Sequence, residues 1–130
     1  MTRINLIPVV DLMDEHLLAE HRELKRIPSM IQKGKVNFEN IPESFTLWTG
    51  HVKFFYNKLW FLKKRYIELY KECLKRWFQV QNYISNFDNI EEKLFWEFVP
   101  SEQDLEISKI RIQEKLDAKP EFYRYYWERR

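Results

Sequence analysis

One stripe of apolar residues constrains the fold of this chain more than any other feature of its sequence. Between positions 52 and 73 the apolar residues follow one another in alternating steps of three and four. They are Val52, Phe55, Leu59, Leu62, Tyr66, Leu69 and Cys73. This spacing lines up one side of an α-helix, and other elements must cover such a side to bury it. We therefore predict a long amphipathic helix, firmest from about Lys58 to Trp77, within the core.

The segment just before this helix allows two interpretations. Residues 49–56 contain Gly50, one of only two glycines in the chain, followed by a run of aromatic residues. Their spacing fits either an extended segment or a short additional helical turn. In both cases we expect a break before Lys58.

A second helical pattern lies near the N-terminus. Its apolar positions recur at roughly whole numbers of helical turns, at Leu12, Leu17, Leu24 and Ile31. Asp11 precedes them as a candidate N-cap. Because proline lacks a backbone N–H and restricts the preceding turn, Pro28 is expected to kink or end this helix.

The third helix is marked at both ends. Ser101 is followed three residues later by Asp104, which is the pattern of a capping box, and Pro120 marks the other end. Leu105, Ile112 and Leu116 are its expected inward residues. The preceding segment, 79–99, lacks a long helical period and is predicted to be a connection with a short helical turn at 90–94.

No alternation of useful length for a strand is present. The predicted fold class is therefore all-α: a compact single domain, residues 1–130, of three principal helices with long irregular connections. The single cysteine excludes an internal disulfide, and Cys73 is expected to be a buried structural thiol. No apolar run approaches the about 18 residues that span a bilayer, and no signal-peptide segment is evident. We expect a soluble monomer in the cytoplasm of a bacterial or virus-infected cell, without a membrane partner.

Several classes of chemistry find no motif here. The histidines His16, His21 and His51 and the lone Cys73 show none of the paired spacings of zinc sites, so no metal and no other cofactor is expected. The sequence also has no glycine-rich phosphate loop, dinucleotide fingerprint or nucleophile elbow. These observations argue against nucleotide hydrolysis and serine-type hydrolysis.

Charge is unevenly distributed along a chain whose net charge is only +2. Residues 53–76 carry eight Lys or Arg against two Glu, whereas residues 88–106 carry seven acids against one Lys. Such segregation can create a basic face that attracts phosphate on a nearly neutral protein. The alternative is a set of ordinary solvated helix surfaces.

The N-terminus offers a nucleophile. Removal of the initiator methionine, expected before a residue as small as threonine, leaves a free α-amine on Thr2. About a tenth of such amines are uncharged at pH 7, compared with far fewer lysines, and the uncharged amine attacks carbon. The alternative is a solvated chain end without a chemical role.

A charged group in the first helical pattern suits the same chemistry. On one continuous helix, Arg22, Glu23 and Arg26 share one side, and His16 joins it two turns earlier. The neighbouring arginines keep Glu23 ionised, and an anion there can stabilise a sugar cation. The alternative is an intrahelical ion pair worth a few tenths of a kcal/mol.

The C-terminal tail interleaves aromatic rings with cations. It begins with Phe122, Tyr123, Arg124 and Tyr125, and aromatic residues make up 17% of the whole chain. Rings can stack on nucleic-acid bases while guanidinium groups hold phosphates. The competing interpretation is a tail that docks its rings into the core, and both can hold for alternate residues.

Together these residues resemble the phage-type pyrimidine-dimer DNA glycosylase family, also called endonuclease V. The resemblance covers nearly all of the chain. It rests on residues 2–6, His16, Leu17, Ala19, Glu20, residues 22–24, Arg26, residues 50–52, residues 54–56, Lys58, Leu59, residues 72–76, Arg111, Glu114, Lys115 and residues 123–126. Matches so widely spaced in one order are specific to this family.

The resemblance implies a DNA repair glycosylase with AP-lyase activity on cyclobutane pyrimidine dimers in ultraviolet-damaged duplex DNA. In such a mechanism the Thr2 amine attacks C1′ of the sugar, an imine forms, and β-elimination cuts the strand. Glu23 becomes the essential carboxylate, while Arg22 and Arg26 hold phosphates and position it. Abasic sites, which need only the imine step, are expected substrates as well. Two alternatives remain: a catalytically inactive helical module that binds damaged DNA, and a helical interaction protein without a DNA role.

The resemblance also assigns DNA contacts beyond these residues. Arg3, Arg111 and Lys115 match phosphate-contacting positions, and the ring-rich tail matches a segment implicated in dimer recognition. Three positions depart from the family pattern: Glu15 and Tyr66 replace glutamines, and Trp127 replaces a glycine. Each departure is expected to alter the DNA surface.

Overall fold

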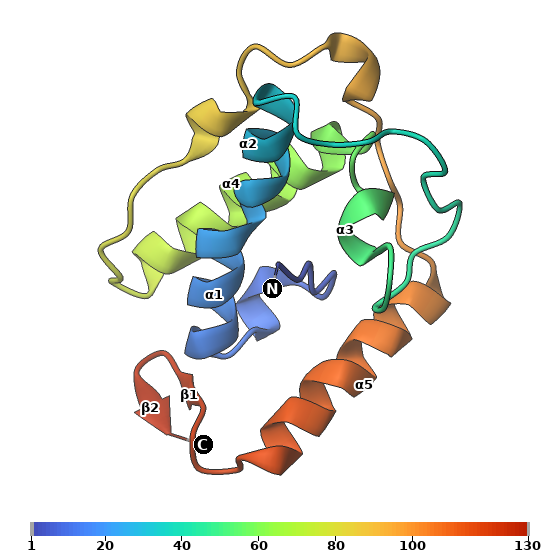
Figure 1. Ribbon diagram of the computed structural model, residues 1–130. Helices are drawn as coiled ribbons and strands as arrows, with labels where there is room; N and C mark the ends of the chain where they lie inside the picture. Colours follow the sequence, from blue (N-terminus) through green and yellow to red (C-terminus); the bar gives the residue numbers. More distant parts are fainter. Residues whose placement is uncertain (1, 130) are drawn as a thin grey trace.

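The computed structural model describes residues 2–129 (Figure 1). The expected removal of Met1 therefore falls outside the described residues. In chain order the elements are η1 (Val9–Asp11), α1 (Asp14–Leu24), α2 (Arg26–Gln32), α3 (His51–Phe54), α4 (Leu59–Lys75), η2 (Ile84–Phe87), η3 (Glu92–Leu94), α5 (Glu102–Ala118), β1 (Arg124–Tyr125) and β2 (Glu128–Arg129), where η denotes a 3-10 helix. The prediction of an all-α fold with three principal helices and long connections is confirmed, with α1, α4 and α5 as those helices.

From Leu59 onward the apolar stripe forms the buried side of α4, as predicted, whereas Val52 lies on α3 and Phe55 is its C-cap. Leu59, Leu62, Leu69 and Cys73 on this helix are fully buried, and α1 packs across it (Figure 1). Burying each large apolar side chain stabilises the fold by about 1.5–3 kcal/mol. The helix begins directly after Lys58, which confirms the expected break. Upstream, α3 shows that the short helical turn was the correct alternative.

The N-terminal helical pattern divides into two helices. Asp11 lies in η1 and α1 begins three residues later, so its predicted role as N-cap was wrong. The four apolar positions proposed for this region are all buried. A break at Lys25 separates α1 from α2, and Pro28 occupies the first turn of α2. Proline is tolerated there because its missing N–H has no partner within the helix.

The third predicted helix, α5, has the expected ends. Ser101 is its N-cap: the Asp104 N–H donates to the Ser101 hydroxyl, and the Ser101 N–H donates to the Asp104 carboxylate, both at 3.1 Å. The helix ends at Ala118, shortly before Pro120. Ile112 is buried, while Leu105 and Leu116 are half-buried. The cap is a local interaction, which explains why the sequence predicted it.

The chain ends in a short antiparallel hairpin that sequence reasoning missed. Its turn residues, Tyr126 and Trp127, have φ values of +50° and +73°. Glycine and asparagine normally occupy such positions, so no turn signal was visible. The Asp14 carboxylate accepts the N–H groups of both turn residues, at 3.0 and 2.7 Å. A residue more than a hundred positions away therefore holds this turn.

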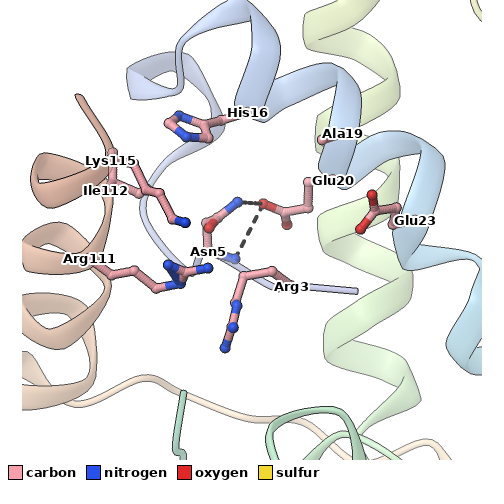
Figure 2. Close-up of a pocket in the computed structure, with 9 residues that line it drawn as sticks. All are labelled: Arg3, Asn5, His16, Ala19, Glu20, Glu23, Arg111, Ile112 and Lys115. Carbon is pink, nitrogen blue, oxygen red and sulfur yellow. Dashed lines mark hydrogen bonds between the residues drawn. The ribbon is translucent and has the colours of Figure 1, made fainter. Parts of the chain in front are cut away.

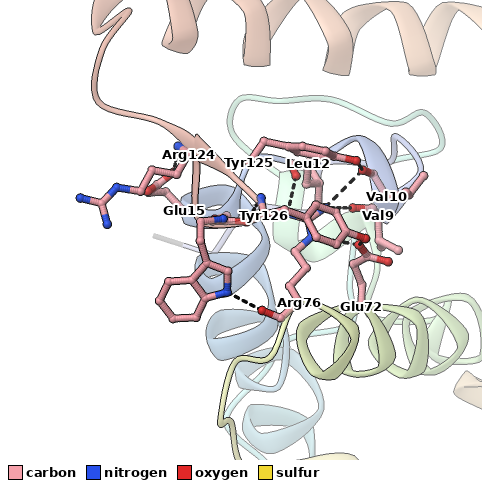
Figure 3. Close-up of polar contacts among 11 residues, drawn as sticks. Val9, Val10, Leu12, Glu15, Glu72, Arg76, Arg124, Tyr125 and Tyr126 are labelled. Carbon is pink, nitrogen blue, oxygen red and sulfur yellow. Dashed lines mark hydrogen bonds and ion pairs between the residues drawn. The ribbon is translucent and has the colours of Figure 1, made fainter. Parts of the chain in front are cut away.

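A fully buried arginine joins the hairpin to the helices (Figure 3). The Arg76 guanidinium donates to the carboxylates of Glu72 at 2.9 Å and Asp14 at 3.0 Å, and to the Leu12 carbonyl at 2.7 Å. The Tyr126 hydroxyl donates to Glu72 at 2.6 Å. Because two carboxylates and several carbonyls surround it, this cation is well compensated for its burial.

Replacing Arg76 with Met is expected to lower the free energy of unfolding by about 3–5 kcal/mol, because it leaves buried carboxylates without their partner. Urea unfolding followed by circular dichroism measures this change. Lys75→Met, at the exposed neighbouring position, is the matched control and should stay within about 0.5 kcal/mol of the wild type. Equal denaturation midpoints for the two variants would contradict the stabilising role of Arg76.

Candidate active site

The N-terminal arm, residues 2–7, is held by hydrogen bonds at two successive residues. The Ile4 N–H donates to Nε2 of His51 at 2.9 Å. The Asn5 side-chain amide donates to Oε1 of Glu20 at 2.8 Å, and its backbone N–H donates to the same oxygen at 3.3 Å. The buried guanidinium of Arg65 pairs with this Glu20 carboxylate. The arm is therefore a fixed part of the core, unlike a solvated chain end.

A cavity of about 170 Å³ lies between the arm, α1 and α5 (Figure 2). Its lining residues are Arg3 and Asn5 from the arm, His16, Ala19, Glu20 and Glu23 from α1, and Arg111, Ile112 and Lys115 from α5. Five residues proposed from the sequence are among them. In Figure 2 the side chains of Arg111 and Lys115 reach from α5 toward the arm, while Glu23 faces the same space from α1.

Helical spacing brings the α1 residues to this cavity. His16, Glu20 and Glu23 follow one another at steps of four and three, which places them on one side of the helix. Sequence reasoning singled out His16 and Glu23 but missed Glu20, although its position three residues before Glu23 was a usable signal. Asn5 was missed as well, and nothing local to the sequence marks it.

Thr2 lies beside the wall of this cavity. It directly precedes Arg3, and consecutive Cα atoms are only about 3.8 Å apart. Thr2 is 9% exposed, and the side chain of Glu23 is 17% exposed. Thr2 itself is not among the lining residues, but it is joined directly to one of them, Arg3, and Glu23 lines the same cavity.

More cationic than unpaired anionic side chains line the cavity. Arg3, Arg111 and Lys115 line it, whereas Glu20 is already paired with Arg65. Burial lowers the pKa of His16 below its usual range, so its imidazole is neutral at pH 7. Nδ1 of His16 is buried and accepts or donates no hydrogen bond within the described part of the chain. The cavity is therefore suited to a phosphate-bearing ligand that also offers a hydrogen bond.

Two of the proposed arginines lie outside the cavity lining. Arg22 forms an ion pair with Glu23 at 3.5 Å, and its side chain is 61% exposed. Arg26 is exposed at the first position of α2. The expected single continuous helix is interrupted at Lys25, so Arg26 lies on α2 while Arg22 lies on α1. Because the Arg22 end of the Arg22–Glu23 ion pair is exposed to solvent, the pair contributes little to stability.

Some residues of the C-terminal tail dock onto the rest of the protein, and others are exposed. Tyr125 is docked: its hydroxyl donates to the Val10 carbonyl at 2.8 Å, and Arg76 lies over its ring. Phe122 is exposed, and Tyr123 stacks on the ring of His16 with 4.7 Å between centroids. The tail therefore reaches the edge of the cavity at Tyr123, through the wall residue His16.

Two further residues of the tail, Arg124 and Trp127, also contact the rest of the protein. The Arg124 N–H donates to Glu15 at 2.8 Å, which ties the tail to α1 (Figure 3). Trp127 is partly exposed and packs against Phe78.

Tyr66 is 1% exposed, so the expectation that it alters the DNA surface was wrong. Its hydroxyl is part of the core, where it accepts the backbone N–H of Tyr83 at 2.6 Å.

The proposed structural role of Cys73 agrees with its environment. Its thiol is fully buried on α4, and burial raises its pKa to about 12. A thiol with this pKa is protonated at neutral pH and is a poor nucleophile. The prediction of an inert, buried cysteine is confirmed.

A wider hollow of about 580 Å³ adjoins the cavity. It shares Arg3, Arg111 and Lys115 and adds apolar groups that include Trp48 and Ile110. The Trp48 indole is 81% exposed. The high aromatic content indicated that some rings face a ligand, but the sequence did not single out Trp48. Cations beside an exposed ring are a combination that suits a nucleotide.

Comparison with known families identifies the chain. Residues 1–85 match the model of a family described as pyrimidine dimer DNA glycosylase. The chain belongs to this family. It is therefore an enzyme, a DNA repair glycosylase, and its substrate is DNA.

The family match covers only part of the glycosylase cavity. It includes the arm, α1 and His51, and it ends before α5 and the C-terminal hairpin. The structure joins the two parts, because Arg111 and Lys115 of α5 face Glu23 across one cavity. The placement of these cations beside the family-matched region thus comes from the tertiary structure.

Two negative findings concern residues 2–129 of the glycosylase. Within this range, no helix has the length and apolar character required to cross a membrane. No group of three or more His, Cys, Asp or Glu side chains in the same range is arranged to bind a metal ion. The absence of a metal cofactor stays a prediction, which cleavage in the presence of a chelator would test.

Proposed function

We propose that this glycosylase is also an AP lyase, which cleaves the 5′ glycosidic bond of cyclobutane pyrimidine dimers in duplex DNA and then cuts the strand. The observation that supports the proposal is the cavity shared by Arg3 and Glu23, because Thr2 directly precedes Arg3 in the chain. After removal of Met1, the free α-amine of Thr2 is proposed to reach this cavity and the Glu23 carboxylate. An amine that attacks a sugar carbon needs a nearby group to balance the positive charge that develops.

The proposed reaction proceeds in two stages. The Thr2 amine attacks C1′ of the 5′ nucleotide of the dimer, and the new C–N bond forms as the glycosidic bond breaks. The sugar ring then opens to give an imine between the amine nitrogen and C1′. In the second stage C2′ loses a proton, the bond to the 3′ phosphate breaks, and the strand is cut. Hydrolysis of the imine releases the enzyme.

Glu23 is proposed to stabilise positive charge on the sugar and to assist the proton transfers. Its side chain is largely shielded from water, and electrostatic attraction is stronger where water is excluded. Glu20 is less suited to this role, because its carboxylate is already engaged by Arg65 and Asn5. The two acids of the cavity therefore have different tasks: Glu20 holds the arm and Glu23 takes part in the reaction.

The cations are proposed to bind the DNA backbone around the lesion. Arg3, Arg111 and Lys115 surround the cavity, while Arg22 and Arg26 extend the basic surface outward. Backbone contacts of this kind position the DNA but do not read its sequence. Entry of the sugar requires the DNA to deform locally, which costs less at a damaged and poorly stacked step.

Replacing Arg111 with Gln is expected to weaken binding to damaged and undamaged duplexes alike. If Arg111 contacts one phosphate, the slope of log affinity against log salt should decrease in magnitude by about one. Fluorescence anisotropy across a salt series measures this slope. Lys109→Gln removes the same charge from the opposite, exposed side of α5 and is the matched control. An unchanged slope for Arg111→Gln would contradict phosphate binding at this position.

Borohydride trapping tests the proposed reaction directly. Processed protein is mixed with a duplex that contains either a cyclobutane dimer or an abasic site, and the imine is reduced. A covalent protein–DNA adduct is expected with both duplexes, together with strand cleavage that persists in the presence of chelator. Damage-dependent binding without an adduct would favour the alternative of a catalytically inactive binding module. Absence of an adduct on both DNAs would refute the proposed mechanism.

A further inference from the structure

His51, at the start of α3, lies outside the residues that line the cavity but contacts the arm directly. Its side chain is buried, and both ring nitrogens are engaged. Nδ1 lies 2.7 Å from the Thr46 carbonyl, and Nε2 lies 2.9 Å from the Ile4 backbone nitrogen. An N–H can only donate and a carbonyl can only accept. Nε2 is therefore the acceptor, Nδ1 carries the proton, and the imidazole is neutral.

The surroundings of His51 maintain this neutral form. Phe45 and Phe55 present their rings at centroid distances of 5.4 and 5.6 Å. Burial lowers the pKa of His51 to about 4, and the nearby charges of Arg3 and Arg111 act in the same direction. The Thr46 carbonyl and the Glu20 carboxylate oppose this shift and do not overcome it. Nε2 is thus available as an acceptor at the pH at which the Thr2 amine becomes uncharged.

We propose that His51 is a positioning residue for the reaction: by binding the Ile4 N–H, it orients the arm so that the Thr2 amine points toward Glu23. This inference rests on the proposed function of the Thr2 amine. Only Arg3 lies between Thr2 and the anchored residue Ile4, so a rotation at Ile4 displaces the amine. Glu20 anchors the next residue, Asn5, and thereby limits movement from the other side.

Apolar packing alone does not provide this orientation. The Ile4 side chain is fully buried, but apolar contacts have little directional preference. A hydrogen bond from the Ile4 N–H fixes the plane of the peptide that joins Arg3 to Ile4. Misplacing a reacting group by about 1 Å can slow a reaction about a hundredfold. Loss of the His51 acceptor should therefore affect the rate more than the affinity for DNA.

Three variants of His51 separate orientation from packing. His51→Phe keeps a ring and His51→Leu keeps a smaller apolar side chain, and both lack the acceptor. His51→Gln retains one acceptor and one donor. Phe87→Leu alters another buried residue, the last of η2, whose ring lies 6.4 Å from that of Tyr66 on α4, and serves as a control for a general loss of stability.

The experiment measures the single-turnover rate of borohydride-trapped adduct on an abasic duplex at saturating DNA, together with the dissociation constant. We expect His51→Phe and His51→Leu to slow adduct formation about a hundredfold, with affinity changed by less than about threefold. His51→Gln should recover at least a tenth of the wild-type rate, and Phe87→Leu should match the wild type. Circular dichroism identifies which of His51→Phe and His51→Leu is folded. The same loss of rate is expected from each of these two variants that folds.

Three results would overturn the role of His51. One is a wild-type rate in a folded apolar variant, another is an equal loss of rate in Phe87→Leu, and the third is a Gln variant no faster than the apolar ones. The result for the wild-type protein shows whether only the role of His51 fails or the proposed function fails as well. If the wild type forms adduct and the His51 variants do so equally well, only the positioning role fails. If the wild type forms none on abasic or dimer DNA, the amine mechanism fails.

Discussion

Replacing Glu23 with Gln is expected to slow glycosidic bond cleavage in a dimer-containing duplex by about a thousandfold, the scale of a lost acid–base or charge-stabilising group. Gln has nearly the same size as Glu but has no charge and cannot exchange a proton. The positive charge that develops on the sugar would then lack its anion. Because Glu23 repels phosphate, its neutralisation should leave the affinity for DNA unchanged or slightly higher.

Single-turnover kinetics and binding assays on the same duplex measure the two effects separately. Glu106→Gln is the matched control, since it makes the same chemical change at an exposed position of α5. It should retain the wild-type rate. If Glu23→Gln cleaved the glycosidic bond at a near-normal rate, Glu23 would have no essential part in the mechanism, whatever the effect of the substitution on binding.

Inserting one glycine between Met1 and Thr2 is the second change with a large expected effect. Methionine removal then exposes the amine of the inserted glycine. A free amine therefore remains, but it lies one residue before Thr2. The displacement is up to about 3.8 Å, because that is the spacing of consecutive Cα atoms. Thr2 is nearly buried beside the cavity, which leaves little room for an added residue. We expect the rate of imine formation to fall by at least about a hundredfold.

Borohydride trapping quantifies this loss, and intact mass establishes that methionine was removed in both proteins. A glycine added after Arg130 is the control, because it changes the length of the chain without moving the N-terminal amine. Binding to damaged duplex should be similar in all three proteins. If the N-terminally extended protein formed adduct at the wild-type rate, the position of the amine would be irrelevant and another nucleophile would be required.

The parts of the fold that were predictable from sequence depend on interactions between near neighbours. The apolar stripe predicted α4, because helical periodicity alone decides which side is buried. Ser101 and Asp104 predicted the start of α5, because a capping box joins residues three positions apart. His16 and Glu23 were placed on one side of α1 by the same periodicity.

The parts that were missed depend on residues far apart in the chain. The C-terminal hairpin has a turn without glycine or asparagine, which Asp14 stabilises from the start of α1. Sequence propensities describe local preference, and tertiary contacts overrode them in this turn.

The sequence by itself determined an all-α fold, the amphipathic side of α4 and a resemblance that the family comparison bears out. The tertiary structure alone decided that α5 brings Arg111 and Lys115 to the cavity of Glu23, and that His51 and Glu20 hold the arm beside it. The physical reason is distance along the chain. Periodicity and capping act over a few residues, whereas a cavity forms only when separate elements pack together and their buried polar groups find partners.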